Sequence, residues 1–126
     1  MNSAFQKLVD IAKHLRSKTG CPWDRKQTIE TLVEHFMNEA TELKEGIEKK
    51  DYQNVKEEIG DVLFNLIMMV NIAEEDKLFT MKEVLEDIAT KIIERHTWVF
   101  GDDKVETPEE AIRKWKENKK KKRLIA

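Results

Sequence analysis

The chain has 126 residues, of which 38% are charged and 7% aromatic, with only four glycines and two prolines. This length suits one domain with a buried core, and the scarcity of turn-forming residues favours helices over a strand-rich fold. The net charge of −2 conceals an acidic body, because the run from Lys119 to Arg123 is entirely basic. An acidic body argues against nucleic acid as a partner, since phosphate backbones need a basic face.

The single cysteine, Cys21, excludes a disulfide within the chain and a cysteine-based zinc site. The N-terminus lacks the apolar core of a signal peptide. The longest apolar stretch runs from Val62 to Ala73, contains two asparagines and is too short to cross a bilayer. We therefore expect a cytoplasmic protein with no membrane partner.

Five helices are predicted from the hydrophobic periodicity and from start signals. They are expected, in chain order, at about residues 4–17, 27–48, 52–76, 81–98 and 108–121. Asp51 is the predicted N-cap of the third helix, and Thr107 with Glu110 forms a predicted capping box before the fifth. The expected fold is all-α: an antiparallel bundle of four to five helices in a single domain over residues 1–126, with a basic tail at about 117–126.

The third predicted helix combines two features that conflict. Its apolar residues from Ile59 to Ala73 cover almost the whole circumference, as in a helix buried within a bundle. Yet Glu58, Asp61 and Asn65 fall within roughly 60° of one another on one face. A buried carboxylate without a partner costs several kcal/mol or becomes protonated. This helix therefore needs a cation beside it.

A second acidic pair lies on the preceding helix, where Glu39 and Glu42 are three residues apart and share one face. If the two helices are antiparallel neighbours, four carboxylates meet across their seam. A divalent metal would relieve the repulsion. A salt bridge to Lys or Arg on a facing helix, or simple exposure of the carboxylates to solvent, would also account for the pattern.

The available ligands are all oxygen atoms, which suit Mg²⁺ or, as a substitute, Mn²⁺. No histidine lies three residues after a glutamate, so the di-iron arrangement of helical bundles is weakly supported. Magnesium held by carboxylates commonly meets a phosphorylated substrate. The sequence contains neither a P-loop nor a dinucleotide-binding glycine motif.

Several short segments together resemble the MazG nucleoside triphosphate pyrophosphohydrolases. The segments occur in the same order and at matching spacings between about Leu15 and Trp115. They are Gly20-Cys21-Pro22-Trp23-Asp24, Asn38-Glu39-Ala40-Thr41-Glu42, Glu57-Glu58-Ile59-Gly60-Asp61, Arg95-His96 and Val99-Phe100-Gly101. The resemblance implies an all-α protein that uses Mg²⁺ to cleave a nucleoside triphosphate between its α and β phosphates, giving the monophosphate and pyrophosphate.

The resemblance also assigns roles. Its implied metal ligands are Glu39, Glu42, Glu58 and Asp61, and either Glu39 or Glu42 would accept the proton of the attacking water. Lys91 and Arg95 resemble a basic pair that the family uses and would bind the outer phosphates. Asn65, one turn beyond Asp61, is placed to contact the sugar or the metal's surroundings. Trp23 would either stack on the base or pin the first loop onto the bundle. Asn38 departs from the family pattern, which has glutamate at that position.

Family members form homodimers or dimers of dimers, so we expect dimerisation to complete the bundle. Related all-α pyrophosphatases that act on dUTP, dCTP or phosphoribosyl-ATP share the acidic motifs and remain alternatives. A catalytically silent helical oligomerisation module is a further alternative, which Asn38 favours.

Overall fold

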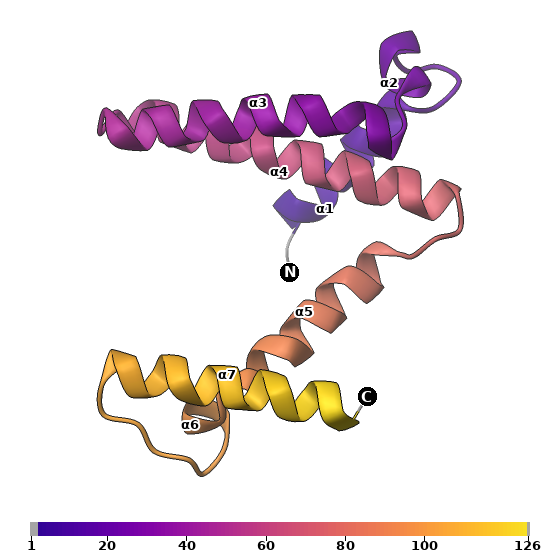
Figure 1. Ribbon diagram of the computed structural model, residues 1–126. Coiled ribbons are helices and arrows are strands. Elements are labelled where there is room, and N and C mark those ends of the chain that lie inside the picture. The colour runs from indigo at the N-terminus through magenta and orange to yellow at the C-terminus, as the bar shows by residue number, and fades with distance from the viewer. Residues whose placement is uncertain (1–2, 126) are drawn as a thin grey trace. The chain divides into compact units, whose positions relative to one another are not determined.

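The computed structural model describes residues 3–125, and the side chains of residues 4–121. Over this part of the chain it contains seven α-helices and no strand (Figure 1). They are α1 (Ser3–Leu15), α2 (Pro22–Lys26), α3 (Ile29–Glu48), α4 (Tyr52–Glu75), α5 (Met81–Arg95), α6 (Thr97–Phe100) and α7 (Pro108–Ile125). The all-α prediction is confirmed, and the five predicted helices correspond to α1, α3, α4, α5 and α7.

The two additional helices are short, and each has a local cause. Helix α2 lies between the first two predicted helices and begins at Pro22, whose fixed φ and missing N–H suit the first helical position. Helix α6 results from a break at His96 in the helix predicted over 81–98. The His96 ring Nδ1 lies 2.7 Å from the Ile92 carbonyl, and its backbone N–H turns to the Ile93 carbonyl at 3.3 Å. The side chain thereby competes with the helical ladder and ends α5.

The chain divides into two compact units, one extending to Met81 and the other beginning at Lys82. In the first unit α3 and α4 lie side by side along most of their length, and α1 packs against α4 (Figure 1). The turn between α3 and α4 contains Lys50 in the left-handed region with φ of 56°. The carboxylate of Asp51 then accepts a hydrogen bond from the Asn54 N–H at 3.3 Å, which confirms the predicted N-cap.

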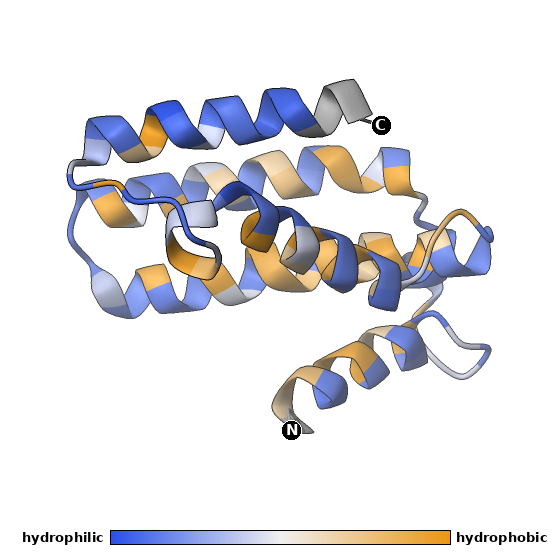
Figure 2. Cartoon of the chain, turned by 90° about the horizontal axis from the view of Figure 1, so that it is seen from below, coloured by the Kyte–Doolittle hydropathy of each residue, from blue (hydrophilic) through white to orange (hydrophobic). Residues whose placement is uncertain are grey.

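The core of the first unit is formed where α1, α3 and α4 meet. Its buried members are Val9, Ala12, Leu32, Ile67, Met68 and Ile72. Figure 2 shows apolar stretches along these helices alternating with hydrophilic ones, as amphipathic packing requires. Burial of α4 is not complete in the single chain, because Ile59, Leu63 and Leu66 form an exposed apolar stripe. The prediction of a helix buried all round is therefore met only on part of its surface.

In the second unit, side-chain hydrogen bonds join α7 to the α5–α6 break. The Asn118 amide donates to the Arg95 carbonyl at 3.2 Å and to Thr97 Oγ1 at 2.9 Å. The Thr97 hydroxyl donates in turn to Asp103 at 2.6 Å, and Lys114 pairs with Asp103 at 3.3 Å. This network fixes the loop before α7.

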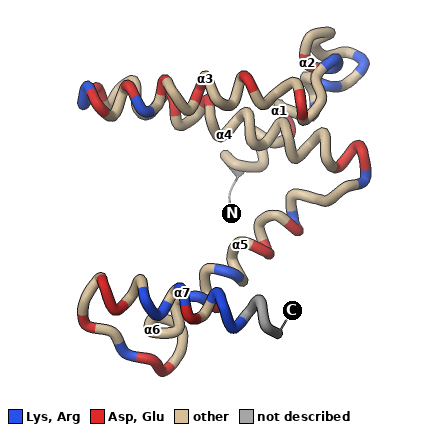
Figure 3. The backbone as a smooth tube through the Cα atoms, viewed as in Figure 1, with Lys and Arg blue, Asp and Glu red and all other residues tan. Residues whose placement is uncertain are grey.

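Helix α7 begins at the predicted site but is capped differently from the prediction. Thr107 Oγ1 accepts from the Glu110 N–H at 3.2 Å, whereas the Glu110 carboxylate reaches the N–H of Glu106 rather than that of Thr107. The basic tail continues the helix, and Figure 3 shows Lys and Arg along it. The side chains of Lys122 and Arg123 fall outside the described residues. None of the helices over residues 3–125 has the length and apolar character needed to span a membrane.

Candidate metal centre

Pairing of α3 with α4 brings together three of the four predicted metal ligands. One carboxylate oxygen from each of Glu39, Glu58 and Asp61 lies within 4.8 Å of the other two. Glu58 is buried, with 7% of its surface exposed, while Glu39 is half-buried and Asp61 is exposed. Figure 3 shows acidic residues on the facing stretches of both helices. The seam therefore holds a compact group of oxygen ligands that opens to solvent on the side of Asp61.

The carboxylates strongly perturb one another. Burial and contact with Glu42, together with the charges of Asp61 and Glu39, raise the pKa of Glu58 to about 7 from an ordinary 4.5. Burial also raises the pKa of Glu39, with further contributions from the charges of Asp61 and Glu42. In the absence of a cation, a single proton on Glu58 relieves part of the repulsion among these carboxylates. The site thus needs either a proton or a cation.

A metal ion accounts for this site better than an ion pair with a Lys or Arg side chain does. One oxygen of Glu39 (Oε2) and one of Glu58 (Oε2) are buried and have no hydrogen-bond partner among the described side chains. The ion pairs formed within residues 4–121 all use other carboxylates. Buried carboxylate oxygens without a partner are unfavourable unless a metal or ordered water satisfies them. Oxygen-only ligands of this kind suit Mg²⁺ or Mn²⁺.

Glu42 has a different place from the other three predicted ligands. It contacts Glu58 by a hydrogen bond. It is not one of the residues whose ligand atoms converge within 4.8 Å. The residues whose carboxylate oxygens converge are Glu39, Glu58 and Asp61.

A cavity of about 150 Å³ opens beside the carboxylates. Its wall is part acidic and part apolar or aromatic, and consists of Trp23, Asp24, Leu32, His35, Glu39, Asp61, Phe64, Asn65 and Met68. The side-chain oxygen of Asn65 is buried and has no hydrogen-bond partner within the described part of the chain. Asn65 and Trp23, both predicted to bind substrate, therefore line the same cavity as two of the candidate ligands.

His35 also lines this cavity, although no role was predicted for it from the sequence. Its ring packs edge-on against Trp23, with ring centroids 5.0 Å apart and planes at 85°. It lies one helical turn before Glu39, which was the available sequence signal. The aromatic pair lines the cavity together with the apolar side chains of Phe64 and Met68.

Lys91 and Arg95, the predicted phosphate-binding pair, belong to the second unit. They line one concave surface there together with Asp87, Thr90 and Glu94. The Arg95 guanidinium also lies 5.1 Å from the centre of the Trp115 ring. Lys119 approaches the same ring at 5.5 Å, so one indole gathers two cations. This cluster is not among the predicted sites, although the four-residue spacing of Trp115 and Lys119 places both on one face of a helix.

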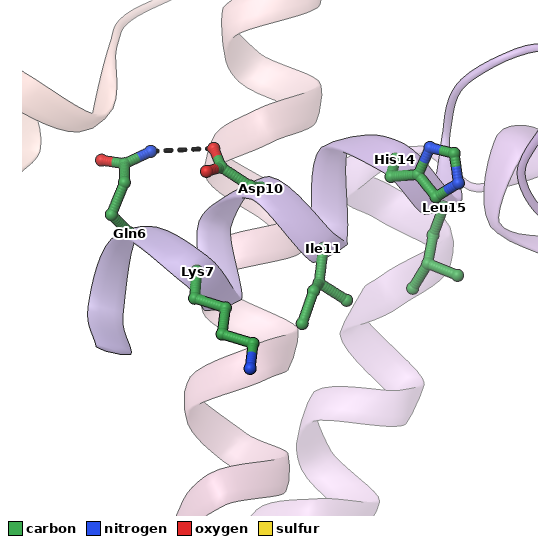
Figure 4. A pocket seen from close by; sticks show the side chains of 6 residues that line it. All are labelled: Gln6, Lys7, Asp10, Ile11, His14 and Leu15. Carbon is green, nitrogen blue, oxygen red and sulfur yellow. Dashed lines mark hydrogen bonds between the residues drawn. The ribbon is translucent and has the colours of Figure 1, made fainter. Parts of the chain in front are cut away.

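A separate concave surface lies on α1 (Figure 4). Its lining comes from one face of this helix: Gln6, Lys7, Asp10, Ile11, His14 and Leu15. The Gln6 amide donates to Asp10 at 2.9 Å, which occupies that carboxylate. This surface therefore lacks the convergent, unpaired oxygens of the α3–α4 seam.

Fold and site together define an all-α protein with a carboxylate centre suited to a divalent metal. The sequence matches the family described as "MazG nucleotide pyrophosphohydrolase domain" over residues 27–100. A mazG-related protein from Thermotoga maritima, known from its crystal structure, superposes with a TM-score of 0.77 at 36% identity, covering 91% of this chain and 98% of that one. The chain belongs to the MazG family.

Two curated relatives extend the comparison. The nucleoside triphosphate pyrophosphohydrolase/pyrophosphatase MazG of Thermotoga maritima is 41% identical over 115 residues, which cover 91% of this chain and 44% of that protein. The nucleoside triphosphate pyrophosphohydrolase of Escherichia coli K12 is 30% identical over 120 residues, which cover 94% of this chain and 46% of that protein. The chain thus matches less than half the length of either relative.

Proposed function

We propose that this protein is a Mg²⁺-dependent nucleoside triphosphate pyrophosphohydrolase that cleaves the bond between the α and β phosphates. Mn²⁺ is expected to substitute. The observation that carries the proposal is the convergence of Glu39, Glu58 and Asp61 at 4.8 Å or less beside a cavity with aromatic walls. Membership of the MazG family supports the same reaction.

In this proposal the carboxylates of Glu39, Glu58 and Asp61 hold the metal, and Glu42 lies beside Glu58 as a further carboxylate of the group. When bound, the metal supplies the positive charge that a polyanionic triphosphate needs to approach the acidic seam and that polarises the α-phosphate. Glu39 is the favoured proton acceptor for the attacking water, because it lines the cavity and one of its oxygens has no hydrogen-bond partner among the described residues. Glu42 remains the alternative base.

The cavity is proposed to receive the nucleoside part of the substrate. Trp23 offers an aromatic face for a base, and Phe64 and Met68 provide apolar contacts that exclude water. The Asn65 oxygen accepts a hydrogen bond from the sugar or the base, which would satisfy an otherwise unpaired buried atom. The polar and apolar halves of this cavity therefore suit a molecule that is anionic at one end and aromatic at the other.

The cations Lys91 and Arg95 are proposed to bind the outer phosphates. Lys119, which contacts the same Trp115 ring as Arg95, would add positive charge nearby. We also propose a homodimer, or a dimer of dimers. The exposed stripe of Ile59, Leu63 and Leu66 on α4 supports this assembly, because apolar surface of this kind is commonly buried by a partner. The cytoplasmic location expected from the sequence is also kept as a proposal.

The experiment is product analysis after incubation with each NTP and dNTP and with phosphoribosyl-ATP, in the presence of Mg²⁺. Monophosphate and pyrophosphate are the expected products. With H₂¹⁸O, attack on the α-phosphorus places the label in the monophosphate, whereas attack on the β-phosphorus places it in pyrophosphate. Diphosphate with orthophosphate as products would overturn the proposal. Turnover confined to dUTP, dCTP or phosphoribosyl-ATP would assign one of the related specificities.

A further inference from the structure

The segment between α1 and α3 carries Trp23 but has little apolar anchorage of its own. Its helix α2 contains no buried residue. Gly20 rests directly on the C-terminal end of α1, where any side chain would collide with the carbonyl oxygens of His14 and Leu15. Apart from the edge-on contact between Trp23 and His35, the position of Trp23 at the cavity therefore depends on polar contacts of this segment.

Besides hydrogen bonds from Arg25 to the Ser17 and Lys18 carbonyls and from Gln27 to that of Trp23, two of these contacts come from one side chain, Arg16. Its Nη1 donates to the backbone carbonyl of Asp24 at 2.5 Å and to that of Gln27 at 3.0 Å. These two carbonyls stand just after Trp23 and at the C-terminal end of α2. Arg16 is thus bound to the backbone on the same short helix that presents the indole.

The other side of the same guanidinium is held by α4. Its Nε donates to Glu75 Oε2 at 2.7 Å and its Nη2 to Glu75 Oε1 at 2.8 Å, a bidentate pair between residues 59 positions apart. The Arg16 side chain is only 10% exposed, although that of Glu75 is 48% exposed. The planar guanidinium group is fixed in orientation because Glu75 binds one side of it and the backbone carbonyls bind another. The flexible ammonium group of a lysine would not be fixed in this way.

We infer that Arg16 and Glu75 are a positioning pair that holds Trp23 against the substrate cavity. The inference rests on the proposed nucleotide hydrolysis, because it gives Trp23 the role of a substrate wall. Helix α4 then contributes twice to the site: Glu58 and Asp61 provide ligands near its start, and Glu75 fixes the aromatic wall from its last residue. Neither Arg16 nor Glu75 lines the cavity itself.

The kinetic test uses Arg16→Lys and Glu75→Gln, measured on the full chain with Mg²⁺ and the best nucleotide. Loss of the fixed indole should raise KM about tenfold, equivalent to one lost contact, and leave kcat within about twofold. The matched control is Lys13→Gln, which removes a neighbouring α1–α4 ion pair with Glu74 at 3.6 Å that makes no contact with α2. The control should keep the parent KM.

A double substitution separates positioning from general stability. In a Trp23→Ala background, Arg16→Lys should raise KM no further, because the side chain that it positions is already gone. Additive increases in KM, or equal increases in Arg16→Lys and Lys13→Gln, would overturn the inference. Should Arg16→Lys fail to fold, Glu75→Gln gives the same comparison from the more exposed partner.

A second readout does not depend on activity. With Trp98 and Trp115 replaced by phenylalanine, the remaining indole is Trp23, whose accessibility is measured by acrylamide quenching. Because Trp23 is already 49% exposed, Arg16→Lys should increase quenching by up to about twofold while the helical circular dichroism is unchanged. Unchanged quenching would overturn the positioning role even in an active enzyme. Increased quenching in a protein that hydrolyses no nucleotide would instead support the positioning of Trp23 by Arg16 and refute the proposed function.

Discussion

Helix α4 carries two glutamates whose environments are opposite. Near its start, Glu58 lies among other carboxylates, and burial with their charges raises its pKa to about 7. At its end, Glu75 lies in the fork of Arg16, and this hydrogen-bonded ion pair lowers its pKa. The charged form of a glutamate on this helix is thus destabilised at position 58 and stabilised at position 75.

The difference shows how a structural charge is distinguished from one available to a ligand. Arg16 satisfies both oxygens of Glu75. By contrast, Glu58 retains a buried oxygen without a hydrogen-bond partner among the described residues. Natural folds seldom keep such a group unless it binds something else. These environments support our proposals of a cation at the seam around Glu58 and of a positioning role for the junction around Glu75.

The largest expected effect comes from removing the charge of Glu58. Glu58→Gln should lower nucleotide turnover and metal affinity by about a hundredfold or more, since a ligand is lost. The control is Glu57→Gln, because Glu57 is the exposed neighbour on the same helix and is not part of the converging group. The measurements are kcat/KM and Mn²⁺ titration. Undiminished metal binding in Glu58→Gln would favour the catalytically silent module.

The two glutamates should also give the metal-free protein opposite pH dependences of stability. The raised pKa of Glu58 means that the folded state binds its proton more tightly than the unfolded state. Its contribution is therefore greatest below pH 4.5 and is lost as the pH rises to about 7. The lowered pKa of Glu75 has the reverse consequence: its contribution is present above about pH 4.5 and is lost as the pH falls through the folded-state value.

Thermal unfolding between pH 3 and 9 tests both signs. Glu58→Gln should remove the decline in melting temperature between about pH 4.5 and 7, and Glu75→Gln the decline on the acid side. Mg²⁺ or Mn²⁺ at a hundred times its dissociation constant should add about 2.7 kcal/mol to the free energy of unfolding of the parent protein. Equal stabilisation of Glu58→Gln by the metal would contradict the assignment of Glu58 as a ligand.

A smaller effect is expected from two buried asparagines of α4, which sharpen the comparison without involving charge. Both Asn65, 8% exposed, and Asn71, 2% exposed, have side-chain amide atoms without a hydrogen-bond partner in the described part of the protein. Only Asn65 lines the cavity. Asn71→Leu should raise the free energy of unfolding by about 1 kcal/mol, because it removes an unsatisfied buried amide.

Asn65→Leu should instead raise KM about tenfold, since a substrate contact is lost. Urea unfolding and steady-state kinetics on both variants make the comparison. An equal rise in KM for Asn71→Leu would show that any polar loss in α4 disturbs the site, and that Asn65 has no special contact with substrate.

Much of this arrangement was predictable because it depends on neighbouring residues. The N-cap Asp51 fixed the start of α4, and the three-residue spacing placed Glu58 and Asp61 on one face. The break at His96 was not predictable from periodicity, because it results from a ring nitrogen competing for the Ile92 carbonyl. Helix α2 was missed because five residues around a proline give no helical period.

The sequence by itself determined an all-α chain of the MazG family and the faces on which its acidic residues lie, since helical periodicity is local. Only the tertiary structure decided what stands opposite those faces. It left the carboxylates of Glu39 and Glu58 without a basic partner among the described residues, and it gave Glu75 the guanidinium of Arg16. The choice between a metal site and a salt bridge depends on contacts across the seam between helices, which no spacing within one helix encodes.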